Sequence, residues 1–121
     1  EVRNFGCVTG VWDKPDSVLT ITEFAEKPDL EYARKHLHIS TMAEDTFLTV
    51  FGIYVLQSEI FAYLDENIRH NVRESGEFQL TSCLDRLRQE QGFSGCLVKG
   101  ERFDIGLPES YRQAIINYGK S

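Results

Sequence analysis

Asp104 is the residue in this sequence whose surroundings best suit a metal ligand. It lies in the stretch from Lys99 to Tyr111, between Gly100 and Gly106. Because both glycines permit tight backbone turns, a carboxylate held between them can be directed at one point in space. Carboxylate oxygens are the ligands that hard cations such as Mg²⁺ prefer. The spacing alone favours a turn residue that hydrogen-bonds its own backbone, and a metal ligand is the alternative interpretation.

A carboxylate and an ammonium group, those of Glu26 and Lys27, stand directly before Pro28. Proline disfavours helix at the residue before it, so the two charged side chains are presented together at the end of an extended segment. The tripeptide alone favours a solvated charge pair in front of a helix, and a ligand-binding pair is the alternative. Tyr54 has two possible interpretations, a core aromatic and a ligand contact, and the core aromatic is favoured.

Strands and helices alternate along the chain, and they must position these residues. Segments 5–12 and 18–24 are rich in strand formers and are expected to pair as antiparallel neighbours. Segment 47–56 is almost continuously apolar, which predicts a central strand buried on both faces. A short strand is expected at 93–98, and helices are expected at 30–37 (after an Asp29 cap), 58–69 (capped by Ser58), 80–89 and 108–118. The predicted fold class is α/β, with a mixed β-sheet flanked by helices.

Length and composition narrow the function classes. A chain of 121 residues forms one domain with a real core, and its net charge of −6 disfavours nucleic acid as a partner. No apolar run approaches the roughly eighteen residues of a membrane span, so no membrane association is expected. Three cysteines without metal-ligand spacing indicate a reduced, cytoplasmic setting. Because the sequence starts at Glu1 and not at methionine, we expect it to be a piece of a longer protein.

Several segments in register resemble one enzyme family. Phe24-Ala-Glu-Lys-Pro28, Gly76-Glu-Phe-Gln-Leu-Thr81 and the segment from Gly100 to Tyr111 are similar to the second half of sugar-1-phosphate nucleotidyltransferases. Asn4 to Val8 and Phe51 to Leu56 match at the corresponding places. The resemblance covers essentially the whole chain and is closest to bacterial UTP–glucose-1-phosphate uridylyltransferases. It implies the C-terminal part of a Rossmann-like (GT-A-like) fold, with residues 1–121 as the sugar-phosphate-binding portion and the N-terminal nucleotide-binding half absent.

The resemblance also implies roles for individual residues. The residues matching Glu26, by its side chain, and Gly6, by its backbone, contact the sugar hydroxyls in that family. The lysine matching Lys27 reaches the sugar phosphate, Tyr54 corresponds to an aromatic near the sugar, and Asp104 matches one of two aspartates that hold the catalytic Mg²⁺. The implied reaction transfers a uridylyl group from UTP to glucose-1-phosphate, giving UDP-glucose and pyrophosphate. No protein nucleophile is required, so no covalent catalytic residue is expected.

Departures from the family pattern shape the expectations. The glycine-rich phosphate loop is missing from this sequence, so the 121 residues alone are expected to be inactive and, with uncovered sheet edges, to form a homo-oligomer. Relatives often carry Thr-Asp where this chain has Thr81-Ser82, and serine can still serve at a helix start.

The alternative to an enzyme is a catalytically silent nucleotidyltransferase-like module for regulation or oligomerisation. Retention of Asp104, Glu26 and Lys27 favours the enzyme, with a nucleoside triphosphate and a sugar-1-phosphate as substrates, while the base and the hexose stay open. A third alternative is an α/β binding domain unrelated to the family.

Overall fold

A four-stranded sheet forms the centre of the computed structural model, which describes residues 2–50, 52–74, 76–100, 102–103 and 105–118. The strands lie in the order β3-β1-β2-β4, and each of the three pairs in the described residues is antiparallel. A mixed sheet would also contain parallel pairs, and none of these three pairs is parallel. The strands are β1 (Gly6–Lys14), β2 (Val18–Glu26), β3 (Leu48–Thr49) and β4 (Ser94–Cys96).

The antiparallel pair β1 and β2 confirms the strand prediction for the first part of the chain. The register shifts between Thr9 and Gly10, which marks an irregularity of the β-bulge type. At Gly10 the two backbones approach so closely that a Cβ atom would lie 2.2 Å from the carbonyl oxygen of Thr20. Only glycine fits there without movement of the main chain.

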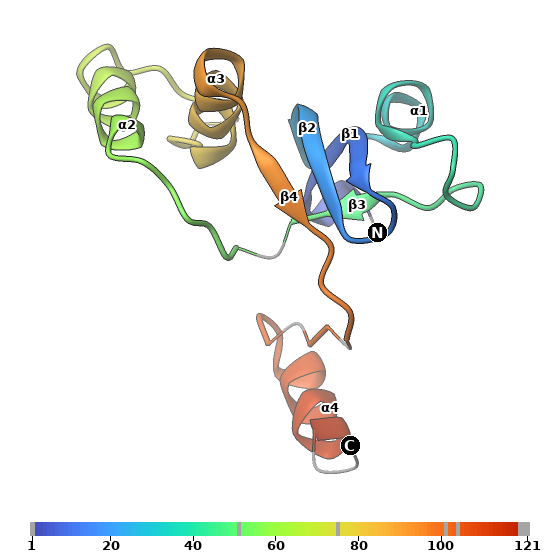
Figure 1. Cartoon of the computed structure of the whole chain (residues 1–121). Helices are drawn as coiled ribbons and strands as arrows, with labels where there is room; N and C mark the ends of the chain where they lie inside the picture. The colour runs from blue at the N-terminus through green and yellow to red at the C-terminus, as the bar shows by residue number, and fades with distance from the viewer. Residues whose placement is uncertain (1, 51, 75, 101, 104, 119–121) are drawn as a thin grey trace.

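Helices cover both faces of the sheet, which confirms the α/β class. In Figure 1, α3 lies on one side of β2 and α1 lies on the other side of the sheet. Asp29 caps α1 as predicted, because its Oδ1 accepts a hydrogen bond of 2.7 Å from the backbone N–H of Tyr32. The Ser58 hydroxyl makes no such cap at α2, contrary to the prediction. The helices are η1 (Val2–Asn4), α1 (Leu30–Tyr32), the π-helix η2 (Ala33–Leu37), α2 (Glu59–Arg69), α3 (Leu80–Gln91) and α4 (Pro108–Tyr118).

The alternation of side chains along β1 divides the core in two. Cys7 points to the face covered by η2, where it packs with Ala33 and Leu37. The next residue, Val8, points to the opposite face and joins the larger cluster under α2 and α3. The buried members of that cluster are Val8, Leu19, Ile21, Phe24, Ile39, Leu48, Ile60, Tyr63, Cys83, Leu84 and Leu87.

The prediction of a central strand at 47–56 is wrong. Among the described residues of this segment, the strand is limited to β3, which pairs with β1 at an edge of the sheet. Farther along, Ile53 and Val55 are 77% and 99% exposed, so this apolar run is not buried on both faces. Apolar composition identified an extended segment correctly but could not tell an edge connection from a central strand.

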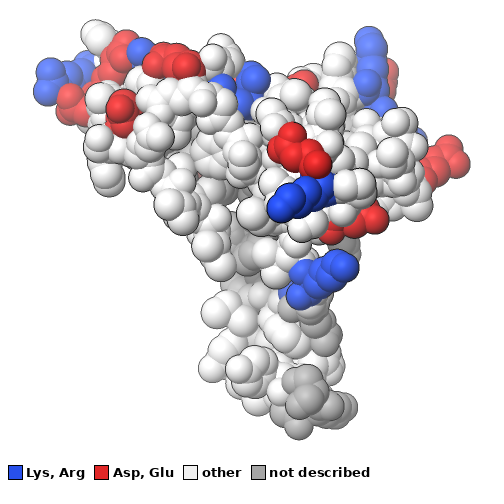
Figure 2. Space-filling model, viewed as in Figure 1, with Lys and Arg blue, Asp and Glu red and all other residues white. Residues whose placement is uncertain are grey.

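Helix α4 stands apart from the other elements in Figure 1. Of the apolar side chains along α4 in the described residues, Ala114 is buried, whereas Tyr111 and Ile115 are more than half exposed. Figure 2 shows few charged side chains over α4 on the face drawn, and mixed acidic and basic groups over the elements above it. Of the helices in the described residues, none combines the length and apolar character needed to cross a bilayer.

Replacing Gly10 with alanine tests the close approach of β1 and β2. The added methyl group meets the Thr20 carbonyl, so we expect Gly10→Ala to lower the free energy of unfolding by about 1–3 kcal/mol. Urea unfolding followed by circular dichroism measures this change. The neighbouring Val11 is 65% exposed, and Val11→Ala should change the same quantity by no more than about 0.5 kcal/mol. Equal stabilities for the two variants would contradict the argument.

Candidate functional site

Gly6 and Glu26 lie directly opposite each other, because the first residue of β1 pairs with the last residue of β2. A Cβ atom on Gly6 would stand 2.9 Å from Cγ2 of Val50 and 3.2 Å from Oε2 of Glu26. The carbonyl oxygen of Gly6 accepts a hydrogen bond of 2.9 Å from the N–H of Val50. Two residues that are twenty positions apart in sequence thus share one end of the sheet, where Val50 and Glu26 occupy the space that a side chain on Gly6 would need.

The Glu26 carboxylate is held by two side chains from different elements. Its Oε2 accepts a hydrogen bond of 2.6 Å from Oγ1 of Thr81 in the first turn of α3. Its Oε1 lies 3.9 Å from Nζ of Lys27. The Glu26 side chain is 25% exposed and that of Lys27 is 57% exposed, so this ion pair is open to solvent and contributes little to stability. The carboxylate is fixed on one side and accessible on the other.

Lys27 adopts a backbone conformation that is unusual for its type. Its φ is +44°, in the left-handed region that favours glycine, and its N–H donates a hydrogen bond of 3.1 Å to the carbonyl oxygen of Phe5. A non-glycine residue held at such a φ stores local strain of about 1–3 kcal/mol, and such strain is often found at functional sites. The turn at Lys27 directs the chain away from β2 immediately after Glu26.

The charge of Glu26 reaches two neighbouring ionisable groups. Burial raises the pKa of the Tyr54 phenol, and the Glu26 charge raises it further. Burial also raises the pKa of the Cys7 thiol to about 11, again with a smaller contribution from Glu26. Tyr54 is half-buried and packs against the larger core cluster, as the core interpretation predicts, while its role near the sugar stays a prediction.

Arg102, which precedes Asp104 by two positions in the sequence, lies close to the start of β1. The guanidinium carbon of Arg102 lies 3.5 Å from the ring centroid of Phe5, a cation–π contact. Phe5 precedes Gly6 and accepts the hydrogen bond from Lys27. Asp104 itself lies outside the described residues, so its predicted role as a metal ligand stays a prediction.

Two open hollows meet at Glu26. One, of about 270 Å³, lies between β2 and α3 and is lined by Phe24, Thr81 and Asp85 among others. The other, of about 260 Å³, lies toward α1 and includes Pro28 and Tyr32 in its lining. Each has room for a small polar ligand, and Glu26 belongs to both linings. The carboxylate is therefore available from more than one direction.

Helix α3 is tied to the sheet by Asp85, one turn after Thr81. Oδ1 of Asp85 accepts a hydrogen bond of 3.3 Å from the backbone N–H of Phe24 and one of 2.7 Å from Nε of Arg88. Burial would raise the pKa of Asp85, but hydrogen bonds from Arg88, Gln89 and Phe24 outweigh it and lower the pKa. This ionised carboxylate fixes α3 beside β2 and so fixes the place of Thr81.

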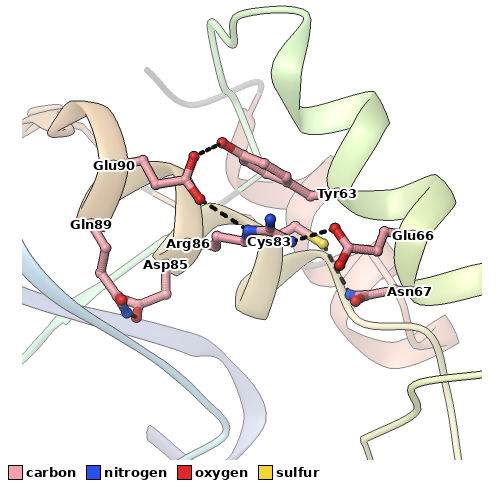
Figure 3. Close-up of polar contacts among 8 residues, drawn as sticks. All are labelled: Tyr63, Glu66, Asn67, Cys83, Asp85, Arg86, Gln89 and Glu90. Atoms are coloured by element: carbon pink, nitrogen blue, oxygen red, sulfur yellow. Dashed lines mark hydrogen bonds and ion pairs between the residues drawn. The ribbon is translucent and has the colours of Figure 1, made fainter. Parts of the chain in front are cut away.

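On its other side, α3 is joined to α2 by a network around Arg86, drawn in Figure 3. The Arg86 guanidinium donates hydrogen bonds of 2.7 Å to Glu66 and 3.0 Å to Glu90. The Tyr63 hydroxyl donates to the same Glu90, and the guanidinium lies 4.2 Å from the Tyr63 ring centroid. The network connects the two helices whose apolar faces cover the sheet, and it limits the freedom of α3 to shift.

The described residues do not by themselves form a metal centre. No group of three His, Cys, Asp or Glu side chains that could hold an ion occurs in the part of the chain that the structure describes. A Mg²⁺ ion at this site would therefore need Asp104 together with oxygen ligands from bound phosphates or from elsewhere in the protein.

The structure brings together Gly6, Glu26, Lys27 and, through electrostatic contact, Tyr54. It adds Thr81, which sequence reasoning treated only as the start of a helix. The signal that could have identified it is its place in the Gly76–Thr81 segment, one of those that carry the family resemblance. Its partner lies 55 residues earlier, beyond the reach of any local pattern.

Comparisons with known proteins agree on one family. The model of the nucleotidyl transferase family matches residues 1–121. A UTP–glucose-1-phosphate uridylyltransferase 1 from Staphylococcus saprophyticus is 30% identical over 112 residues, which are 90% of this chain and 34% of that protein. A UTP–glucose-1-phosphate uridylyltransferase from Pseudomonas aeruginosa is 29% identical over 118 residues, which are 94% of this chain and 36% of that protein.

Solved structures show the same likeness. A crystal structure of UDP-glucose pyrophosphorylase complexed with UDP-glucose is 29% identical, with a TM-score of 0.73 over 98% of this chain and 40% of its own chain. The apo form of a UDP-glucose pyrophosphorylase gives a TM-score of 0.77 over 99% of this chain and 38% of its own. The chain thus spans about a third of the length of the curated relatives.

Thiol labelling tests the environment beside Glu26. With a pKa of about 11, only about one Cys7 thiol in a thousand is ionised at pH 8, and the thiolate is the form that reacts. We expect iodoacetamide to label the exposed Cys96 first and to leave the buried Cys7 and Cys83 unmodified in the native protein. Mass spectrometry of peptides locates the labels, and guanidinium-unfolded protein, labelled at all three, is the control. Native labelling of Cys7 as fast as Cys96 would show that this packing is wrong.

Proposed function

This chain belongs to the nucleotidyl transferase family, and from that premise we propose that the protein transfers a uridylyl group from UTP to glucose-1-phosphate. The products are UDP-glucose and pyrophosphate. The curated relatives that bear the name of this activity, and the solved UDP-glucose pyrophosphorylase complexed with UDP-glucose, support the proposal. Because the chain spans about a third of those relatives, residues 1–121 are assigned the sugar-phosphate-binding portion of the whole enzyme.

One observation carries the assignment: Gly6, Glu26 and Lys27 lie together at one end of the β1–β2 pair. A carboxylate can accept hydrogen bonds from two hydroxyls, which suits the edge of a hexose ring. An ammonium group beside it suits a phosphate dianion. Because Gly6 has no side chain, the Glu26 carboxylate can lie close to its backbone at the end of the strand pair. The three residues thus offer complementary chemistry to the two ends of glucose-1-phosphate.

The reaction needs alignment more than covalent chemistry from the protein. The phosphate oxygen of the sugar must stand in line behind the α-phosphorus of the nucleotide, so that pyrophosphate leaves on the opposite side. In this proposal Glu26 and Gly6 fix the ring, while Lys27 neutralises and orients the attacking phosphate. No residue of the chain forms a covalent intermediate.

We assign Mg²⁺ as the cofactor, with Asp104 as one ligand. A Mg²⁺ ion bound by carboxylates and phosphates neutralises charge that develops on phosphoryl oxygens. Asp104 lies outside the described residues, so its assignment as a ligand rests on the family resemblance of its segment. The contact of Arg102 with Phe5, the residue before Gly6, supports the assignment.

Exposed apolar surface favours self-association, which is one part of the alternative function. Two apolar side chains of α4, those of Tyr111 and Ile115, are 52% and 60% exposed. Ile53 and Val55 are exposed as well. Burial of such surface between copies is favourable, at about 25 cal/mol per Å². We therefore propose that the protein is a homo-oligomer, a property compatible with either function.

Light scattering at two protein concentrations tests the self-association. We expect the weight-average mass to exceed that of a monomer and to rise with concentration, because the exposed apolar side chains of α4 gain contacts. The double variant Tyr111→Ser with Ile115→Ser should lower the mass toward the monomer. A monomer at both concentrations, for the unaltered chain, would contradict the proposal.

Steady-state kinetics of the complete gene product that carries these residues tests the substrate assignment. We expect Glu26→Gln and Lys27→Met each to lower kcat/KM for glucose-1-phosphate by about ten- to a hundredfold, because each removes a charge-assisted contact. The KM for UTP should stay nearly unchanged. Glu31→Gln, an exposed change on α1, serves as the matched control. Unaltered kcat/KM in both site variants would rule out the proposed sugar-phosphate site.

A further inference from the structure

We propose that Thr81 is a positioning residue that sets the orientation of the Glu26 carboxylate and thereby the discrimination among hexose 1-phosphates. The inference rests on the proposed function and deepens it. It assigns a task to a residue that the family resemblance included in a motif without giving it a role. Thr81 does not need to touch the sugar to act in this way.

The two oxygens of the Glu26 carboxylate have different surroundings. Oε2 of Glu26 accepts the 2.6 Å hydrogen bond from Thr81 and faces the crowded side, where a Cβ atom on Gly6 would be 3.2 Å away. Oε1 is 3.9 Å from the ammonium of Lys27 and has no closer polar contact in the described residues. A ligand hydroxyl can therefore approach Oε1, while Oε2 serves to hold the group in place.

The Thr81 hydroxyl, which donates the hydrogen bond to Glu26, is held rigidly. Threonine is β-branched, so few side-chain rotamers are open to it on a helix, and its hydroxyl points in a defined direction. Thr81 lies in the first turn of the twelve-residue helix α3, which Asp85 ties to the backbone of β2 and Arg86 ties to α2. The hydroxyl that holds Glu26 is thus fixed by packing on both sides of its helix.

The orientation of the Glu26 carboxylate affects which sugar is preferred. A carboxylate whose plane is fixed accepts hydrogen bonds from hydroxyls only in certain directions, so it distinguishes epimers that differ at one hydroxyl. Without the Thr81 hydroxyl, the Glu26 side chain gains rotational freedom about its terminal bonds. It can then follow a misplaced hydroxyl, at an entropic cost that falls on every substrate. Loss of Thr81 should therefore weaken the preferred sugar most and flatten the preference.

A purely structural role for the Thr81–Glu26 bond is the competing explanation, since the bond also joins α3 to β2. That role predicts lower thermal stability and a similar loss of activity with every substrate. The positioning role predicts a loss confined to the sugar phosphate, a changed ratio between epimers and recovery when the hydroxyl is restored. Substrate preference therefore separates the two.

The test compares Thr81→Val with Thr81→Ser in the complete gene product that carries this chain. For each variant, kcat/KM is measured with glucose-1-phosphate and with its epimer galactose-1-phosphate, at saturating UTP and Mg²⁺, together with the KM for UTP. We expect Thr81→Val to reduce the preference between the epimers about tenfold, with KM for UTP unchanged, as fits the loss of one hydrogen bond to a charged group. Thr81→Ser should restore the preference to within about twofold, because it keeps the hydroxyl.

Two controls make the outcomes distinguishable. Thr20→Val removes a comparable exposed bond of 2.9 Å to Asp13, near the opposite end of β2, and should leave the preference unaltered. Glu26→Gln, measured in parallel, reports on the proposed function itself. If Thr81→Val does not fold by circular dichroism, Thr81→Ala takes its place in the same comparison.

An unchanged epimer ratio in Thr81→Val, with a strong effect of Glu26→Gln, would overturn the positioning role and leave the proposed function standing. An equal loss with both sugars that serine does not restore would overturn it as well, in favour of the structural role. No effect of either Glu26→Gln or Thr81→Val on the sugar kinetics would remove the proposed function and this inference with it.

Discussion

The register of β1 against β2 is the constraint on which the site depends. Side chains alternate along a strand, so a slip of one residue would send Glu26 to the opposite face of the sheet. The register holds because Gly10 lets the two backbones close on each other at the irregularity after Thr9. The pairing of Gly6 with Glu26 at the far end of the hairpin is then a consequence of chain geometry, and no contact between those two residues is needed to create it.

Helix α3 adds the second constraint, because two hydrogen bonds fix it against β2. Asp85 accepts from the backbone of Phe24, and Thr81 donates to the side chain of Glu26, two residues farther along the strand. One bond sets where the helix lies and the other uses that placement to hold a functional group. The exposed ion pairs of Arg86 have modest value singly, but as a network with the Tyr63 ring they restrict the helix from the other side.

Local signals in the sequence were sufficient for much of the fold and for part of the site. The hairpin, the Asp29 cap and the three longer helices follow from patterns within a few residues of each position. Segment 47–56 failed because apolar, β-branched composition describes extended chain equally well at a sheet edge and at its centre. The Thr81–Glu26 bond could not be predicted, because it joins residues that only the tertiary packing of α3 on β2 brings together.

Glu26 and Lys27 are neighbours in sequence, yet the structure treats them differently. The carboxylate is largely enclosed and held by a fixed donor, whereas the ammonium is more than half exposed at the end of a flexible stem. A preorganised acceptor loses little entropy on binding, which suits a sugar ring whose shape does not change in the proposed reaction. A mobile cation suits a phosphate that must move toward the α-phosphorus as the new bond forms, because the attraction can then grow toward the transition state. The left-handed φ of Lys27 turns the backbone directly after Glu26, the last residue of β2. The two neighbouring side chains therefore start from differently oriented backbone and can take these different roles.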